Sequence, residues 1–248
     1  MYTKVKTAEE IENMRVAGKM LHQVLEHVKN RATAGMSTKD LADRAAAELK
    51  TLGGKPSFLG YEGFPDVLCV SVNDEVVHGM PNTLNLLEEG DVVSIDFGVT
   101  YKGMVTDAAL TFTIGAVDPK VTKLIQTTER AMMAGIDQLK AGVRIGDVAS
   151  AIQKVLDAGG YGIVRDLVGH GVGHYLHEEP NIPNYGHAGS GDVLKAGMTI
   201  AIEPMATLGG YHVTMDPDGW TIRTKDRSLA AHFEHTILIT EKGYEILT

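Results

Sequence analysis

The sequence predicts an α+β fold in which the strands form a mainly antiparallel sheet. Helical patterns and strand-like apolar runs come in groups instead of alternating, which is typical of this class. The order helix, helix, strands occurs twice at one constant offset, which indicates an internal repeat with pseudo-twofold symmetry. The 248 residues, 44% of them hydrophobic, suffice to bury a large core. We therefore expect one domain over residues 1–248, made of two pseudo-equivalent halves, about 1–115 and 116–248.

The first half begins with two helices. Thr7 and Glu10 have the spacing of a capping box, and apolar residues then recur at helical spacing until Ala34-Gly35. A second helix is expected to begin near Ser37-Thr38 and to end at Gly53-Gly54, because glycine favours a helix C-terminus. Strand-like runs follow at Val67–Val72, Asp91–Val99 and Ala108–Ile114.

The second half repeats this order. Apolar residues at helical spacing run from Val121 to Leu139, and again from Ile145 to Leu156 with an end at Gly159-Gly160. The strands expected after these helices are Val164–Val168, Met198–Glu203, Trp220–Arg223 and His235–Thr240.

The repeat places acidic residues at equivalent positions. Asp96 and Glu203 lie 107 residues apart, each at the end of an apolar run, and Ala34-Gly35 matches Ala141-Gly142 at the same offset. Asp107 and Glu234 each precede a predicted strand, and their separation of 127 requires a longer connection in the second half. Two halves related by a twofold would bring four carboxylates to the centre of one sheet, with the helices covering its opposite face.

Composition and charge exclude several classes of function. A net charge of −9 argues against nucleic acid as the main ligand. The single cysteine, Cys69, excludes an intramolecular disulfide, and the first residues lack the apolar core of a signal peptide. No apolar run reaches the length of a membrane span. We expect a cytoplasmic monomer, without a built-in ribosome-docking module, so that any ribosome contact is transient.

The segment Val168–Pro180 is the strongest candidate for a reactive centre. It places His170, His174 and His177 among glycines, which let backbone and imidazole approach a ligand closely. A lone histidine in such a segment is more often part of a structural turn. The four acids in strand-like runs favour the functional interpretation, because a buried carboxylate needs a partner.

Four carboxylates in one cleft repel one another and stay ionised together only around cations. Oxygen-rich ligation with one imidazole suits Mn, Fe, Co or Zn, and two bridged ions would lie about 3.5–4 Å apart. Such a pair activates a bridging water and polarises a carbonyl, which is the chemistry of hydrolysis. Glu203 would also move the proton, and His78 and His177 are candidate partners for the oxyanion or the substrate amide. His78 alone is equally compatible with a simple turn.

Over essentially its whole length the chain resembles the type I methionine aminopeptidases, which have the pita-bread fold. The motifs are Ser94-Ile95-Asp96, Thr106-Asp107, Gly169-His170-Gly171, Ile202-Glu203-Pro204 and Phe233-Glu234-His235. The resemblance implies metal ligands at Asp96, Asp107, His170, Glu203 and Glu234, and substrate contacts at His78 and His177. It further implies a methionine pocket lined by Tyr61, Phe64, Cys69 and Trp220, whose aromatic walls suit a thioether.

The activity implied is dinuclear metal-dependent removal of the initiator methionine from newly made proteins that carry a small second residue. A hydroxide bridging the two ions would attack the first peptide carbonyl. The chain departs from the usual family pattern by Val105-Thr106 where His-Gly is common, His174 for Arg, Leu176 for an aromatic residue, and Phe64 for Tyr. These changes leave the ligands intact and bear on the side-chain preference.

Two alternatives remain open from the sequence. A pita-bread hydrolase that cleaves Xaa-Pro bonds shares the ligand order, but such enzymes usually carry an additional N-terminal domain. A catalytically silent binding module keeps the fold, but such relatives have lost ligands. Cys69 alone is most simply a small core residue, and Trp220, after a turn-forming segment, is equally compatible with a loop anchor.

Overall fold

The computed structural model describes residues 1–248 and contains the four predicted helices. They are α1 (Ala8–Lys29), α2 (Thr38–Leu52), α3 (Pro119–Ile136) and α4 (Ile145–Gly159). The predicted capping box is present, since Thr7 accepts from the backbone N–H of Glu10 and the Glu10 side chain accepts from that of Thr7. Two predicted ends were too late, because α1 ends before Ala34-Gly35 and α3 ends before Leu139. No helix combines the length and hydrophobicity that crossing a bilayer requires.

The strands are short except for one long hairpin. In the first half they are β1 (Lys55–Pro56), β2 (Cys69–Val72), β3 (Glu75–Val77), β4 (Val92–Tyr101) and β5 (Met104–Thr113), with a 3-10 turn at Tyr61–Gly63. In the second half they are β6 (Gly162–Ile163), β7 (Gly169–Gly171), β8 (Glu178–Ile182), β9 (Thr199–Ile202), β10 (Met205–Thr207), β11 (Val213–Met215), β12 (Ile222–Thr224), β13 (Ala230–His232), β14 (His235–Ile239) and β15 (Tyr244–Ile246).

Every strand pair is antiparallel, which confirms the predicted α+β class. The expectation of one sheet was wrong, because the strands form four sheets. The largest are β15-β14-β9-β7-β8 and β1-β4-β2, the latter with β5 on β4; the smaller ones are β13-β10-β6 and β11-β12-β3. The two larger sheets are joined by an isolated bridge between Ala109 and Glu234 and by hydrogen bonds between Thr236 and Asp107.

The internal repeat is visible in matching backbone contacts. The N–H of Gly35 donates to the carbonyl of Leu87 (2.7 Å), and that of Gly142 donates to Leu194 (2.9 Å), at the predicted offset of 107. The isolated bridges Ser37–Leu86 and Arg144–Val193 repeat at the same offset. These contacts tie the start of α2 and of α4 to the loop before β4 and β9, so the two halves are built alike.

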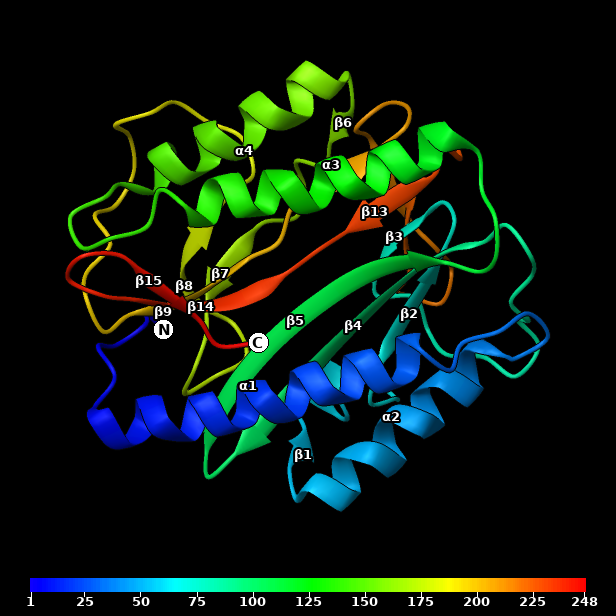
Figure 1. The fold of residues 1–248 in the computed structure, drawn as a ribbon, viewed down its shortest axis with the longest axis horizontal. Helices are drawn as coiled ribbons and strands as arrows, with labels where there is room; N and C mark the ends of the chain where they lie inside the picture. Colours follow the sequence, from blue (N-terminus) through cyan, green and yellow to red (C-terminus); the bar gives the residue numbers. More distant parts are fainter.

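The helices lie in two pairs at opposite margins of the view, α1 with α2 and α3 with α4, with the strands between them (Figure 1). Helix α1 packs against β4 and β5, and α3 packs against β9, β10 and β13. Each half has its own hydrophobic core, one including Leu21 and Phe97 and the other Leu124 and Ile200. Leu110 of β5 packs against both cores and joins the halves.

Three predicted strands differ from the structure. Residues 164–168 are irregular, because only Gly162–Ile163 pairs and Arg165 turns outward over the rings of Tyr185 and Tyr211. The strand predicted at Ala108–Ile114 begins four residues earlier, so Asp107 lies inside β5. The strand predicted at Trp220–Arg223 begins at Ile222, because Asp218 accepts from the backbone N–H groups of Trp220 and Thr221 and holds them in a turn.

At Gly18, helix α1 passes close to the C-terminal end of the chain. A Cβ on Gly18 would lie 1.9 Å from the carbonyl oxygen of Leu247. Alanine normally stabilises a helix interior by about 1 kcal/mol relative to glycine. Here Gly18→Ala is expected to lower the free energy of unfolding by about 1–3 kcal/mol, measured by urea denaturation. The control, Lys19→Ala on the exposed face, should change it by less than about 0.5 kcal/mol; a more stable Gly18→Ala protein would contradict the prediction.

Candidate metal centre

The hairpin of β4 and β5 places two acids side by side. Lys102 and Gly103 form the two-residue turn that joins the strands, and their φ angles are 46° and 83°. Positive φ angles at both positions give a turn whose twist matches the right-handed twist of the flanking strands. The register that follows sets Asp96 opposite Ala109 and Gly98 opposite Asp107. Asp96 and Asp107 are therefore diagonal neighbours on one face of the sheet.

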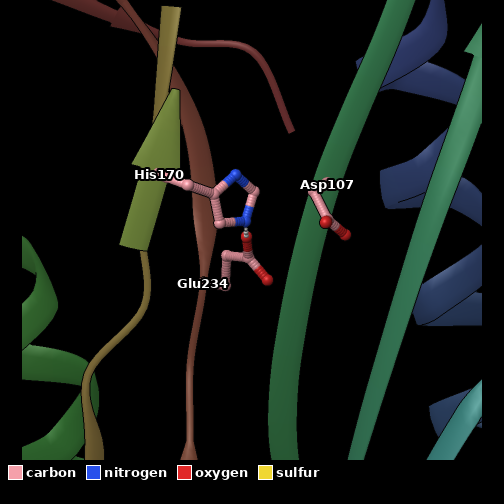
Figure 2. A group of neighbouring side chains, drawn as sticks. All are labelled: Asp107, His170 and Glu234. Atoms are coloured by element: carbon pink, nitrogen blue, oxygen red, sulfur yellow. Dashed lines mark ion pairs between the residues drawn. The ribbon is translucent and has the colours of Figure 1, made fainter. Parts of the chain in front are cut away.

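The other three candidate ligands come from the second half. His170 is the central residue of β7, Glu203 follows β9 directly, and Glu234 precedes β14 directly. Asp107, His170 and Glu234 each offer a ligand atom, and these atoms all lie within 4.8 Å of one another (Figure 2). The Nε2 atom of His170 is 3.3 Å from Oε1 of Glu203 and 4.0 Å from Oε1 of Glu234. The cluster thus straddles the seam between the halves.

Backbone contacts across the seam hold this cluster together. The N–H of Glu234 donates to the carbonyl of Ala109 (2.9 Å), which fixes the segment before β14 against β5. The Thr236 hydroxyl accepts from the N–H of Asp107 (2.9 Å) and donates to the carbonyl of Asp107 (2.8 Å). Both acids are therefore positioned by the same pair of strands.

The His170 imidazole is oriented for ligation. Its Nδ1 is 3.0 Å from the carbonyl oxygen of Gly171, and because a carbonyl only accepts, Nδ1 carries the proton. The lone pair of Nε2 therefore points toward Glu203 and Glu234, which is the arrangement of a metal-ligating histidine. Burial, and then the neighbouring His177, lowers the pKa of His170 to about 3, so the ring is neutral.

The carboxylates lack the partners that buried acids need. Oδ1 of Asp96, Oδ1 of Asp107 and Oε1 of Glu234 are buried without a hydrogen-bond partner. Burial raises the pKa of Asp96 to about 7 and raises the pKa values of Asp107, Glu203 and Glu234 well above their ordinary range, with further contributions from neighbouring acids. Orphaned oxygens and mutual repulsion are both removed by divalent cations, so this donor set fits metal binding.

One cavity of about 110 Å³ is lined by all eleven residues that the sequence singled out. These are Asp96, Asp107, His170, Glu203 and Glu234 with His78, His177, Tyr61, Phe64, Cys69 and Trp220. The Tyr61 hydroxyl is 2.8 Å from Nδ1 of His177, whose ring lies 4.4 Å from that of His170, edge to face. The rings of Phe64 and Trp220 meet edge to face at 5.2 Å and form an apolar wall.

His78 enters this cavity from an unusual backbone conformation. It follows β3 directly and has a φ of 58°, which is uncommon for a residue with a side chain. Burial lowers the pKa of His78 to about 4, so its ring is neutral. The next residue, Gly79, packs so closely on β2 that a Cβ would lie 2.2 Å from the carbonyl oxygen of Val70.

Some site residues escaped sequence reasoning. Phe58 and Glu62 also line the cavity, and no motif distinguished Phe58 from a core residue. Leu176, noted in the sequence as a departure from the family pattern, lines the cavity as well. His232 is buried with its Nε2 atom 3.7 Å from Oε2 of Glu203. Conversely, His174 does not line the cavity, because its Nε2 is paired with Oε1 of Glu10 on α1 at 2.8 Å.

Comparisons with known proteins agree with this geometry. The family model described as metallopeptidase family M24 matches residues 12–241. The chain is 43% identical to a methionine aminopeptidase of Clostridium acetobutylicum, covering 98% of both proteins. It superposes on the crystal structure of a methionine aminopeptidase from Thermotoga maritima with a TM-score of 0.98, 46% identity and 99% of both chains covered. A prolidase from Pyrococcus furiosus matches with a TM-score of 0.79 and 25% identity, over 98% of this chain and 65% of that one. These neighbours confirm the predicted pita-bread fold.

The buried acids predict a pH dependence that metal should remove. Burial raises the pKa values of Asp107, Glu203 and Glu234 in the folded, metal-free chain, so these groups hold protons at pH values at which the unfolded chain has released them. Asp96, whose folded pKa is about 7, shifts in the same direction, so we expect the unfolding free energy to fall as pH rises from 7 to about 8.5. Below pH 7 the imidazoles whose pKa values are lowered in the folded chain oppose this trend, because the unfolded chain protonates them first. They are His78, His170, His177, His232 and His235.

The measurement is the melting temperature at pH 7 and pH 8.5, with a chelator and with excess Mn²⁺. We expect a decrease with pH in the chelator and a smaller or absent decrease with Mn²⁺. The stabilisation by Mn²⁺ should therefore be larger at pH 8.5, because ion binding displaces protons. An equal effect of Mn²⁺ at both pH values would contradict this reading of the carboxyl groups.

Proposed function

Because this chain belongs to metallopeptidase family M24, we propose that it is an aminopeptidase that removes N-terminal methionine from newly made proteins with a small second residue. The observation that supports this most is the single cavity in which five candidate metal ligands adjoin an apolar, aromatic pocket. A peptide whose first carbonyl lay at the acids would direct its first side chain between the aromatic walls. Relatives named methionine aminopeptidase match over nearly the whole chain.

We propose that Asp96, Asp107, His170, Glu203 and Glu234 hold two divalent ions, of Co, Mn, Fe or Zn. Their orphaned oxygens and the free Nε2 of His170 support this assignment. The chemistry that divalent ions supply in such a site is Lewis acidity toward the carbonyl and toward the attacking water. Glu203 accepts a proton from that water and returns it to the leaving amine.

The two cavity histidines act as neutral hydrogen-bond donors. Burial lowers the pKa values of His78 and His177, so neither ring is charged at neutral pH. A Tyr61 hydroxyl that donates to Nδ1 of His177 leaves the Nε2–H group of that ring free for the substrate. We assign His177 and His78 to the oxyanion and the substrate amide, where preorganised donors stabilise developing charge.

The first side chain of the substrate is assigned to the pocket of Tyr61, Phe64, Cys69 and Trp220. A thioether is apolar and polarisable, and it makes favourable contacts with aromatic edges. Leu176 adds an aliphatic wall. The family resemblance places an aromatic residue at this position, so the pocket of this chain differs there in shape.

We also propose that residues 1–248 act as one catalytic domain of two halves, about 1–115 and 116–248. Asp96 and Asp107 come from the first half, while His170, Glu203 and Glu234 come from the second, so neither half holds the site alone. The proposed substrate places the protein in the cytoplasm, as a monomer that contacts the ribosome only transiently. Peptide N-termini, and neither nucleic acid nor a membrane, are its proposed partners.

Peptide cleavage tests the activity. The chain loaded with Mn²⁺, Fe²⁺ or Co²⁺ under reducing conditions should release methionine from Met-Ala-Ser and leave Leu-Ala-Ser largely intact, as measured by chromatography. Asp107→Asn is the control, since it removes a charge from the ligand set and should lower both metal binding and turnover. Absence of methionine release with all three metals would count against the proposal.

Two other outcomes would favour the alternative functions. Cleavage of Met-Pro but not Met-Ala peptides would favour an Xaa-Pro hydrolase, and absence of bound metal after anaerobic loading would favour a silent binding module.

Phe64 provides a test of the pocket. Phe64→Ala removes the edge-to-face contact with Trp220 and one wall of the cavity. We expect kcat/KM for Met-Ala-Ser to fall about 10–100-fold, which is the usual range for lost apolar complementarity. Phe112→Ala removes a partly buried ring of the first core, remote from the cavity, and should lower stability without this loss. Equal effects of the two substitutions on kcat/KM would contradict the pocket assignment.

A further inference from the structure

His232 is a buried imidazole whose backbone is held on both sides. It is the last residue of β13, opposite Met205 of β10, and its side chain is almost fully buried. The Thr111 hydroxyl accepts from the N–H of His232 (2.9 Å) and donates to its carbonyl (2.7 Å). The ring therefore occupies a defined position beside the segment that carries Glu203, with little freedom to move away.

The polar atoms of this ring have no hydrogen-bond partner. Both Nδ1 and Nε2 of His232 are buried without one. A neutral imidazole carries one N–H donor and one acceptor nitrogen, and in this ring neither is satisfied. A buried donor without an acceptor costs about 1–3 kcal/mol, so the fold requires a reason for this histidine.

Glu203 is the carboxylate against the ring, and the imidazole of His78 is a second ionisable neighbour. Nε2 of His232 is 3.7 Å from Oε2 of Glu203, while Oε1 of the same carboxylate is 3.3 Å from Nε2 of His170. The carboxylate of Glu203 thus lies between two imidazoles, each facing a different oxygen. If Nε2 of His232 and Oε2 of Glu203 lay about 0.5 Å closer together, they would be within the range of an N–H···O hydrogen bond.

We propose that His232 is a positioning residue, whose Nε2–H group holds Oε2 of Glu203 and thereby orients the other oxygen toward the metal centre. The proposal rests on the proposed function, in which Glu203 both ligates metal and moves the proton. Such a carboxylate needs a fixed orientation, because a rotation about its terminal bond would exchange the two oxygens. Hydrogen bonds to ligating carboxylates typically contribute about 10–100-fold to metal affinity or activity.

Three substitutions separate a hydrogen bond from simple packing. His232→Leu fills the space without a donor, His232→Gln places an amide N–H near the position of Nε2, and His232→Asn places it near Nδ1, too far from Glu203. We expect kcat on Met-Ala-Ser to fall about 10–100-fold in His232→Leu and His232→Asn, with KM changed less than about threefold. His232→Gln should stay within about threefold of the unsubstituted chain.

Two measurements besides activity accompany the kinetics. The visible absorption spectrum of the Co²⁺-loaded protein reports the ligand geometry, and it should change in His232→Leu and His232→Asn but not in His232→Gln. Melting temperatures report the loss of packing. His235→Asn is the matched control, since it removes a partly buried imidazole whose Nδ1 faces Thr248 outside the cavity, and it should leave kcat and the spectrum unchanged.

The outcomes are distinguishable. Unchanged kcat and an unchanged Co²⁺ spectrum in His232→Leu would overturn the proposal, as would losses that follow melting temperature equally in all three variants. If the unsubstituted chain releases no methionine, the proposed function fails. The Co²⁺ spectra of the same proteins would then still decide whether His232 orients Glu203.

Discussion

Four carboxylates and one imidazole share a buried seam between the two halves of this chain, and such an arrangement requires compensating positive charge. Their burial raises the pKa values of all four acids and leaves three of their oxygens without hydrogen-bond partners. A fold seldom retains unpartnered buried acids for structural reasons alone, because each one is costly. The electrostatic demand of this cluster therefore links the architecture to the metal chemistry of the family.

A small number of backbone contacts across the seam hold the acids in this arrangement. The bridge between Ala109 and Glu234 and the two hydrogen bonds of Thr236 to Asp107 fix strands from different sheets against each other. Each half supplies an independent core and a helix pair, and Leu110 packs against both cores. A rigid scaffold is thus built on each side of a site that belongs to neither half.

The halves are alike in backbone but differ in the chemistry they bring to the cavity. The first half provides two acids and most of the aromatic pocket, with Tyr61 and Phe64 near the 3-10 turn. The second half provides His170 and His232, which lie beside Glu203, and His177, whose ring lies against that of His170; none has a counterpart at the repeat offset. The repeat therefore places the four carboxylates symmetrically. The histidines, which the repeat does not duplicate, make the cavity asymmetric, as binding a peptide in one direction requires.

Sequence alone determined the α+β class, the four helices, the 107-residue offset and the candidate acids and histidines, because caps, helical periodicity and acids in apolar runs are local signals. The pocket residues Tyr61, Phe64, Cys69 and Trp220 came from the family resemblance, and Phe58 and Glu62 were not predicted. It did not determine that residues 164–168 are irregular, that β5 begins at Met104, or that the strands divide into four sheets, because pairing depends on distant partners. Tertiary structure alone placed His232 against Glu203 and turned His174 toward Glu10. The physical reason is that burial and direction of a side chain are set by contacts between distant segments, which no local pattern contains.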